Sequence, residues 1–219
     1  MTRFSHQQSG PNSCAAAVTM VALRELSVPI PLPNCTSTAL TQVCEIDLWD
    51  QMKDLRVGTG VTDWQCTPLS VVNFLHTQGL SVAIVHDSTR VGFVLDAWSK
   101  DYPELRGFYK DRFTTPLAKL SSTIANVQSG INLPGDFNND ARVILLCLIE
   151  GGNPPSPLHY LLARKDGNSY WIMNPDGATD TQLNRVGLQQ FLAENVDRGL
   201  SISGPTNYIY TGIALIVHK

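Results

Sequence analysis

Charged residues are scarce in this sequence. Asp, Glu, Lys and Arg make up 16% of its 219 residues, against about a quarter in an ordinary globular domain. The net charge of −3 argues against a nucleic-acid partner. Because apolar residues reach 43%, the composition is also too hydrophobic for a disordered chain. We therefore expect one globular domain with its own core.

Long apolar runs and cofactor motifs are also missing. No apolar run reaches the roughly 18 residues of a membrane-spanning helix, and the opening MTRFSHQQSGPNS lacks the apolar core of a signal peptide. We expect a soluble protein with no signal peptide and no membrane partner. The chain contains no G-x-G-x-x-G, Walker loop or H-E-x-x-H motif, so we expect no metal and no other cofactor.

The five cysteines form no recognisable pattern. They stand at positions 14, 35, 44, 66 and 147, an odd number without a C-x-x-C spacing. Neither a zinc site nor a disulfide scaffold is indicated. Because thiols scattered in this way are typical of a reducing compartment, we expect a reducing cytoplasm.

Local patterns predict mostly helices in the first half and mostly strands in the second, an α+β layout. The helices expected first run from Asn12 or Ser13 to about Leu26, over 46–55, from Thr67-Pro68 to Gly79, and over most of 91–128. A strand is expected over 80–86 and a loop over 129–140. The second half predicts strands over 141–150 and 208–217, a hairpin over 159–174 and a helix over 186–196.

The hairpin brings two polar residues together. If Asp166-Gly167 forms a two-residue type I′ loop, every pair of opposite residue numbers sums to 333. His159 then lies opposite Asn174, with Cβ atoms about 5 Å apart. A slip of one strand by a single residue would place the two side chains on different faces.

The stretch HQQSGPNSCAAAVTM, residues 6–20, places Cys14 at the start of a nearly all-apolar helix. The positive end of a helix lowers the pKa of a thiol, and the free N–H of Cys14 can donate to an oxyanion. Gln8, six residues upstream, supplies a second donor. With His159 as base and Asn174 to orient it, Cys14 has the partners of a catalytic nucleophile.

Alternatives stay open at each of these positions. Cys66 also precedes a helix, although no histidine motif accompanies it. Asp176 could orient the base while Asn174 serves the NPDG turn, and Gln7 could replace Gln8. We interpret three further histidines as structural, solvent-facing or cleft-rim residues: His6, His76 and His86.

Three segments resemble one enzyme family. QSGPNSCAAAVTM resembles the Gln-x5-Cys opening of papain-like peptidases that process bacteriocin leaders at a double glycine, and of their stand-alone relatives. HYLLARKDGNSYWIMNPDG is similar to the family's histidine strand, turn and Asp-Pro strand. GTGVTDWQCTPLSVVNFLHTQGLSVAIV is similar to its Gly-Thr segment, helix and strand. The likeness covers about a third of the chain. Ala15 and Asn174 depart from the family's usual Gly and frequent Asp.

The resemblance implies a papain-like two-lobed fold in a single domain, 1–219. A helix-rich lobe of about 1–130 would carry Cys14, and an antiparallel sheet lobe of about 141–219 would carry His159. It implies a cysteine peptidase that forms an acyl-enzyme at Cys14 on a protein or peptide substrate, cleaving after Gly-Gly in some relatives. His159 would be the base, Asn174 its orienter and Gln8 part of the oxyanion hole.

Some stand-alone relatives are toxin or effector domains that bacteria deliver into competitors. For such a protein the reducing cytoplasm is the producer's or the target cell's, and a cognate inhibitor or immunity protein is a partner. Three alternatives use the same fold: a transglutaminase- or deamidase-type acyl transferase, a cell-wall amidase, and a non-catalytic binding module.

Overall fold

The computed structural model describes residues 3–35, 39–56, 59–61, 63–87, 89–92, 94, 115, 127–131, 137–149, 158–193, 200–203 and 206–219. At 127–131, 200–203 and 206–207 it describes the backbone alone. The helices are α1 (Cys14–Glu25), α2 (Gln42–Met52), α3 (Pro68–Thr77) and α7 (Arg185–Ala193), with a 3-10 turn η1 (Pro33–Cys35). The strands are β1 (Leu55–Arg56), β2 (Trp64–Gln65), β3 (Ser81–His86), β4 (Val127–Ile131), β5 (Arg142–Ile149), β6 (Leu158–Asp166), β7 (Ser169–Asn174), β8 (Thr179–Leu183), β9 (Leu200–Ser203) and β10 (Thr206–His218).

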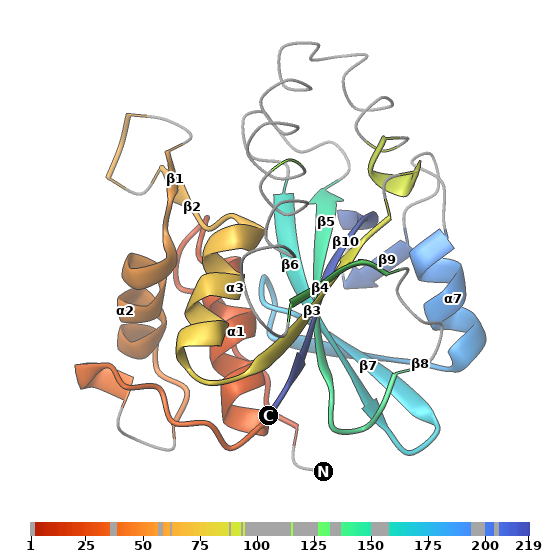
Figure 1. The fold of residues 1–219 in the computed structure, drawn as a ribbon, viewed down its shortest axis with the longest axis horizontal. Coiled ribbons are helices and arrows are strands. Elements are labelled where there is room, and N and C mark those ends of the chain that lie inside the picture. Colours follow the sequence, from red (N-terminus) through yellow and green to blue (C-terminus); the bar gives the residue numbers. More distant parts are fainter. Residues whose placement is uncertain are drawn as a thin grey trace.

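One large sheet organises the molecule. Its strands lie in the order β4-β3-β10-β5-β6-β7-β8, and β9 pairs with β10. Helices α1, α2 and α3 gather on one side of the sheet, and α7 lies on the other (Figure 1). One apolar core lies under α1–α3 and a second under α7. The mixed helix and sheet content agrees with the predicted α+β class.

Strand β3 crosses the predicted boundary between a helix-rich lobe and a sheet lobe. It comes from the first half of the chain, yet it pairs with β10 inside the same sheet as the second-half strands. Its other neighbour, β4, runs parallel to it, whereas the other pairs in this sheet are antiparallel. The papain-like two-lobed arrangement therefore stays a prediction. Among the described residues, no helix is both long and apolar enough to cross a membrane.

Most predicted elements appear, with shifted ends. Helix α2 begins four residues before the expected start because Thr41 caps it, accepting a hydrogen bond from the Cys44 N–H at 3.2 Å. Thr67 caps α3 as predicted, and Gly79 follows that helix at φ +76°. The loop expected over 129–140 is wrong where β4 extends to residue 131. The helix expected over 91–128 lies almost wholly outside the described residues.

The predicted hairpin forms, but with a different register. The observed pairs, such as Asp166 with Ser169 and Arg164 with Trp171, sum to 335 rather than 333. The turn is centred on Gly167-Asn168 and only Gly167 has a positive φ, +61°, so it is not type I′. Because the shift is two residues, every side chain keeps its predicted face.

A buried ion cluster fastens α1 to the sheet. The carboxylate of Glu25, the last residue of α1, accepts from Arg142 Nε and Arg164 Nη1, both at 2.6 Å. It also accepts from the backbone N–H of Phe4 at 2.9 Å. Arg164 pairs in addition with Asp180 of β8. The cluster thus connects the helix to three strands.

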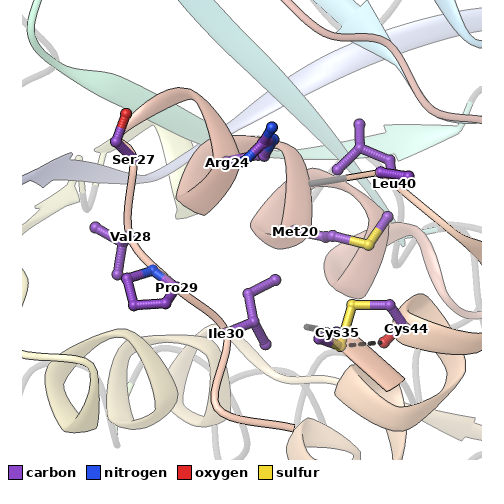
Figure 2. A pocket seen from close by; sticks show the side chains of 10 residues that line it. Met20, Arg24, Ser27, Val28, Pro29, Ile30, Cys35, Leu40 and Cys44 are labelled. Carbon is purple, nitrogen blue, oxygen red and sulfur yellow. Dashed lines mark hydrogen bonds between the residues drawn. A yellow bond between two sulfur atoms is a disulfide. The ribbon is translucent and has the colours of Figure 1, made fainter. Parts of the chain in front are cut away.

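Cys35 and Cys44 form a disulfide, which corrects the expectation that all the cysteines are thiols. The bond lies opposite Met20 of α1 at a cavity of about 480 Å³, whose wall also includes Val28 and Ile30 (Figure 2). Cys14, Cys66 and Cys147 are free. Because disulfides persist in oxidising compartments, the bond does not support the predicted reducing compartment, which stays a prediction.

Replacing Glu25 by Ala should destabilise the fold strongly, because the buried guanidinium of Arg142 would lose its carboxylate partner and that of Arg164 would lose one of its two. We expect a loss of about 3–5 kcal/mol in the free energy of unfolding, measured by urea denaturation. The matched control is Asp50→Ala, which removes the exposed pair with Lys53 and should cost less than about 1 kcal/mol. Equal losses in the two variants would contradict a clamping role for Glu25.

Candidate active site

The structure brings His159 and Asn174 into direct contact. Nε2 of His159 lies 2.8 Å from Oδ1 of Asn174, and both residues are buried. The same oxygen accepts from the backbone N–H of Asp176 at 3.1 Å, which identifies it as the carbonyl end of the amide. Because Oδ1 can only accept, Nε2 must carry a hydrogen, and Nδ1 of the neutral ring is left as the proton acceptor.

Tyr208 of β10 completes this network, and the sequence analysis missed it. Its hydroxyl accepts from Nδ2 of Asn174 at 3.0 Å and donates to Oδ2 of Asp176 at 2.8 Å. Its ring centroid lies 5.0 Å from that of His159. Asp176 itself is 3.9 Å from Nε2 of His159. Asn174 is therefore the direct partner of His159, and Asp176 is connected to Asn174 through the Tyr208 hydroxyl.

Cys14 lies beside the start of β6 but is not bonded to the histidine. Its sulfur is within hydrogen-bond reach of the Tyr160 backbone N–H. Cys14 packs with Tyr160 in the core under α1, whereas His159 shares the other face of β6 with Leu161. Among the described residues, no hydrogen bond joins Cys14 to His159. Both side chains therefore lie at the N-terminal end of β6.

The loop before Cys14 is attached to the segment that follows Asn174. The backbone N–H of Gln8 donates to the Pro175 carbonyl at 2.9 Å. The side-chain amide of Gln8 donates to the Gly10 carbonyl at 3.0 Å, and no donor among the described residues reaches its buried Oε1. The predicted oxyanion role of Gln8 stays a prediction. Gln7, the alternative, is exposed and donates to the Asp176 carbonyl at 3.3 Å.

A buried carboxylate orders the same loop. Oε2 of Glu45, on α2, lies 2.6 Å from Nε2 of His6 and accepts from Ser9 Oγ at 2.8 Å. Its Oε1 accepts from the Ser9 N–H at 2.8 Å. Burial alone would raise the pKa of Glu45, but hydrogen bonds from His6, Ser13 and Ser9 hold it below its ordinary value. His6 is therefore a buried partner of Glu45, not a residue of the cleft rim.

Burial disfavours charge on both candidate catalytic groups. Burial, with a smaller contribution from the Asp176 charge, raises the pKa of Cys14 to about 12 although backbone N–H groups oppose the shift. Burial lowers the pKa of His159, although Asp176 and Asn174 partly offset it. Burial therefore favours the neutral thiol and the neutral imidazole, in contrast to the lowered thiol pKa expected from the helix end.

The rival nucleophile Cys66 is a neighbour of Cys14. The two cysteines line a cavity of about 10 Å³ together with Asn12, Gln65, Leu158 and Tyr160. Burial raises the pKa of the Cys66 thiol well above its ordinary value. In the described part of the chain no histidine is hydrogen-bonded to Cys66, and no cluster of three His, Cys, Asp or Glu residues could hold a metal.

Comparisons with known proteins add no relative. No protein-family model matches the chain, and no curated protein matches it significantly. The family resemblance therefore rests on the three quoted segments.

Tyr208→Phe should disturb the base through Asn174. The variant leaves Nδ2 of Asn174 without its tyrosine acceptor, which should cost about 1–3 kcal/mol of stability and admit a second tautomer of His159. Long-range 1H–15N spectra at neutral pH should show the Nε2–H tautomer alone in the wild type. The control is Tyr210→Phe, because no described residue hydrogen-bonds the buried Tyr210 hydroxyl. An unchanged tautomer in Tyr208→Phe would contradict the network.

Iodoacetamide should label the resting thiols slowly and evenly at about pH 6, because burial raises the pKa of Cys14, Cys66 and Cys147 alike. Peptide mass mapping gives the labelling rate of each cysteine, and His159→Ala should leave these rates unchanged. Fast labelling of Cys14 alone, lost in His159→Ala, would instead demonstrate a thiolate–imidazolium pair.

Proposed function

We propose that this protein is a cysteine peptidase with Cys14 as nucleophile, His159 as base and Asn174 as its orienter. The observation that carries the proposal is the 2.8 Å contact between Nε2 of His159 and Oδ1 of Asn174, which leaves Nδ1 as proton acceptor. The position of Cys14 also supports the proposal. Its sulfur is within hydrogen-bond reach of the backbone N–H of Tyr160, the residue after His159 on β6. Nucleophilic catalysis requires a histidine oriented in this way and a thiol that it can deprotonate. Cys14, at the start of α1, is the thiol that lies next to Tyr160, the strand neighbour of His159.

The reaction starts when Sγ of Cys14 meets Nδ1 of His159 around the start of β6. Because burial disfavours separate charges, the thiol proton moves to Nδ1 as the sulfur attacks the substrate carbonyl carbon. The oxyanion accepts from the Cys14 N–H, with Gln8 as second donor once its amide leaves the Gly10 carbonyl. The imidazolium then protonates the leaving amine. Water, deprotonated by His159, cleaves the thioester and restores the thiol.

The acyl acceptor separates this proposal from its nearest alternative. If water accepts the acyl group from a backbone amide, the chain is cut. If the attacked amide is a glutamine side chain, the same residues convert it to glutamate with water, or transfer its acyl group to an amine. The proposal includes the papain-like arrangement and a protein or peptide substrate. An effector role with an immunity partner is compatible with it, provided that the Cys35–Cys44 bond forms before delivery.

The test compares wild type with Cys14→Ala and His159→Ala on a peptide library prepared from whole-cell protein. We expect new peptide N-termini with the wild type, and a loss of at least about a thousandfold in cleavage rate with either variant. Cys66→Ala is the matched control, since its thiol lines the same cavity. Cleavage that persists in Cys14→Ala would refute the proposal, and conversion of glutamine to glutamate without cleavage would favour the deamidase.

A further inference from the structure

Helix α2 turns an apolar row outward. Val43 is 54% and Ile46 46% exposed, and Trp49, three residues further on, is half-buried. Residues spaced by three lie on one helix face. Adjacent apolar side chains left in water next to a cavity make this face of α2 a candidate binding surface.

A cavity lies between this face and the loop before the nucleophile. Its volume is about 230 Å³, and it is lined by Ile46, Trp49 and residues 9–13. A space of roughly 150 Å³ is enough to hold a benzene ring. Sites for whole small molecules usually measure roughly 300–1,000 Å³. The cavity therefore matches one large side chain rather than a whole ligand.

The two walls of the cavity are fastened to each other. Glu45, the residue before Ile46, points inward and binds both the N–H and the hydroxyl of Ser9 at 2.8 Å. At the other end of the loop, the Ser13 hydroxyl donates to the Gly10 carbonyl and accepts from the Gly10 N–H, both at 3.0 Å. Because the bonds of Glu45 join α2 to the loop directly behind the cavity, the space is held open before a ligand arrives, and ordering it costs little on binding.

The cavity is adjacent to the candidate active site. Asn12 lines both this cavity and the small one that contains Cys14 and Cys66. Ser13, also in the wall, is the residue before Cys14. Since an extended peptide advances about 3.3 Å per residue, a substrate with its carbonyl at Cys14 would carry a nearby side chain to this opening.

We propose that the cavity is the specificity pocket of the enzyme and binds a large apolar side chain, such as Leu, Met or Phe, close to the scissile bond. That the bound side chain belongs to a substrate rests on the proposed peptidase function. A glycine cannot fill the space, so the double glycine implied by the resemblance does not account for this pocket.

The binding experiment does not depend on catalysis. The indole N–H of Trp49 reports on the wall, and its signal among the four tryptophans is assigned with Trp49→Phe. In 15N-labelled Cys14→Ala protein, N-acetyl-phenylalaninamide should shift this signal saturably, whereas N-acetyl-glycinamide should not. Ile46→Glu should abolish the shift. The control is Val186→Glu on α7, where an equally apolar residue is 68% exposed, and it should behave as the parent. Equal shifts with both amides, or none, overturn the pocket.

The cleavage experiment then tests the occupant. In the peptide library, sites cut by the wild type should be enriched in Leu, Met or Phe at one fixed position. Ile46→Glu should raise KM for such peptides about tenfold or more with little change in kcat, and Val186→Glu should match the wild type. Amide binding without any peptide cleavage would refute the peptidase but not the pocket. Cleavage without apolar enrichment would refute the pocket as a specificity site but not the peptidase.

Discussion

The ion cluster around Glu25 is the constraint from which the site follows. Helix α1 is apolar along most of its length, so packing alone would allow it to slide along the sheet. The bonds of Glu25 to Arg142 and Arg164 fix the C-terminal end of the helix against β5 and β6. A helix is a rigid rod with a rise of about 1.5 Å per residue. Fixing one end therefore fixes where Cys14, at the other end, meets β6.

The N-terminal end depends on a second buried carboxylate. Glu45 is hydrogen-bonded to His6 and to both the N–H and the hydroxyl of Ser9, so the polar segment before Cys14 has one internal anion as its common partner. An anion buried with this many donors is stabilised in place, whereas a buried anion without them would be costly. The two carboxylates have parallel roles, one at each end of α1.

Sequence patterns predicted what is local. The start of α1, the Thr67 cap of α3 and the existence of the hairpin follow from neighbouring residues. The contact between His159 and Asn174 was predicted with the wrong register and still occurs, because a shift of two residues conserves strand faces. Face alternation was therefore the reliable part of the prediction.

Long-range relationships were not predictable from one sequence. Tyr208 reaches Asn174 because β10 places its hydroxyl over the second core, 34 residues further along the chain. Glu45 and Glu25 look like ordinary helix-surface acids until their partners are known. The Cys35–Cys44 bond has the same origin, since it depends on how η1 lies against α2. The raised pKa of Cys14 was missed because the helix-end argument ignores desolvation.

Under the proposed function, the Cys35–Cys44 disulfide gives this chain two opposed redox requirements. A nucleophilic cysteine is usually kept active with an excess of small thiol, and such a thiol also exchanges with disulfides. Here the bond ends at Cys44, next to Glu45, and its sulfurs line an open cavity. A reductant strong enough to protect Cys14 would also act on the bond beside Glu45, the residue that orders the loop leading to Cys14. Protein prepared with a strong reductant and protein prepared without it would therefore differ in whether the Cys35–Cys44 bond is intact.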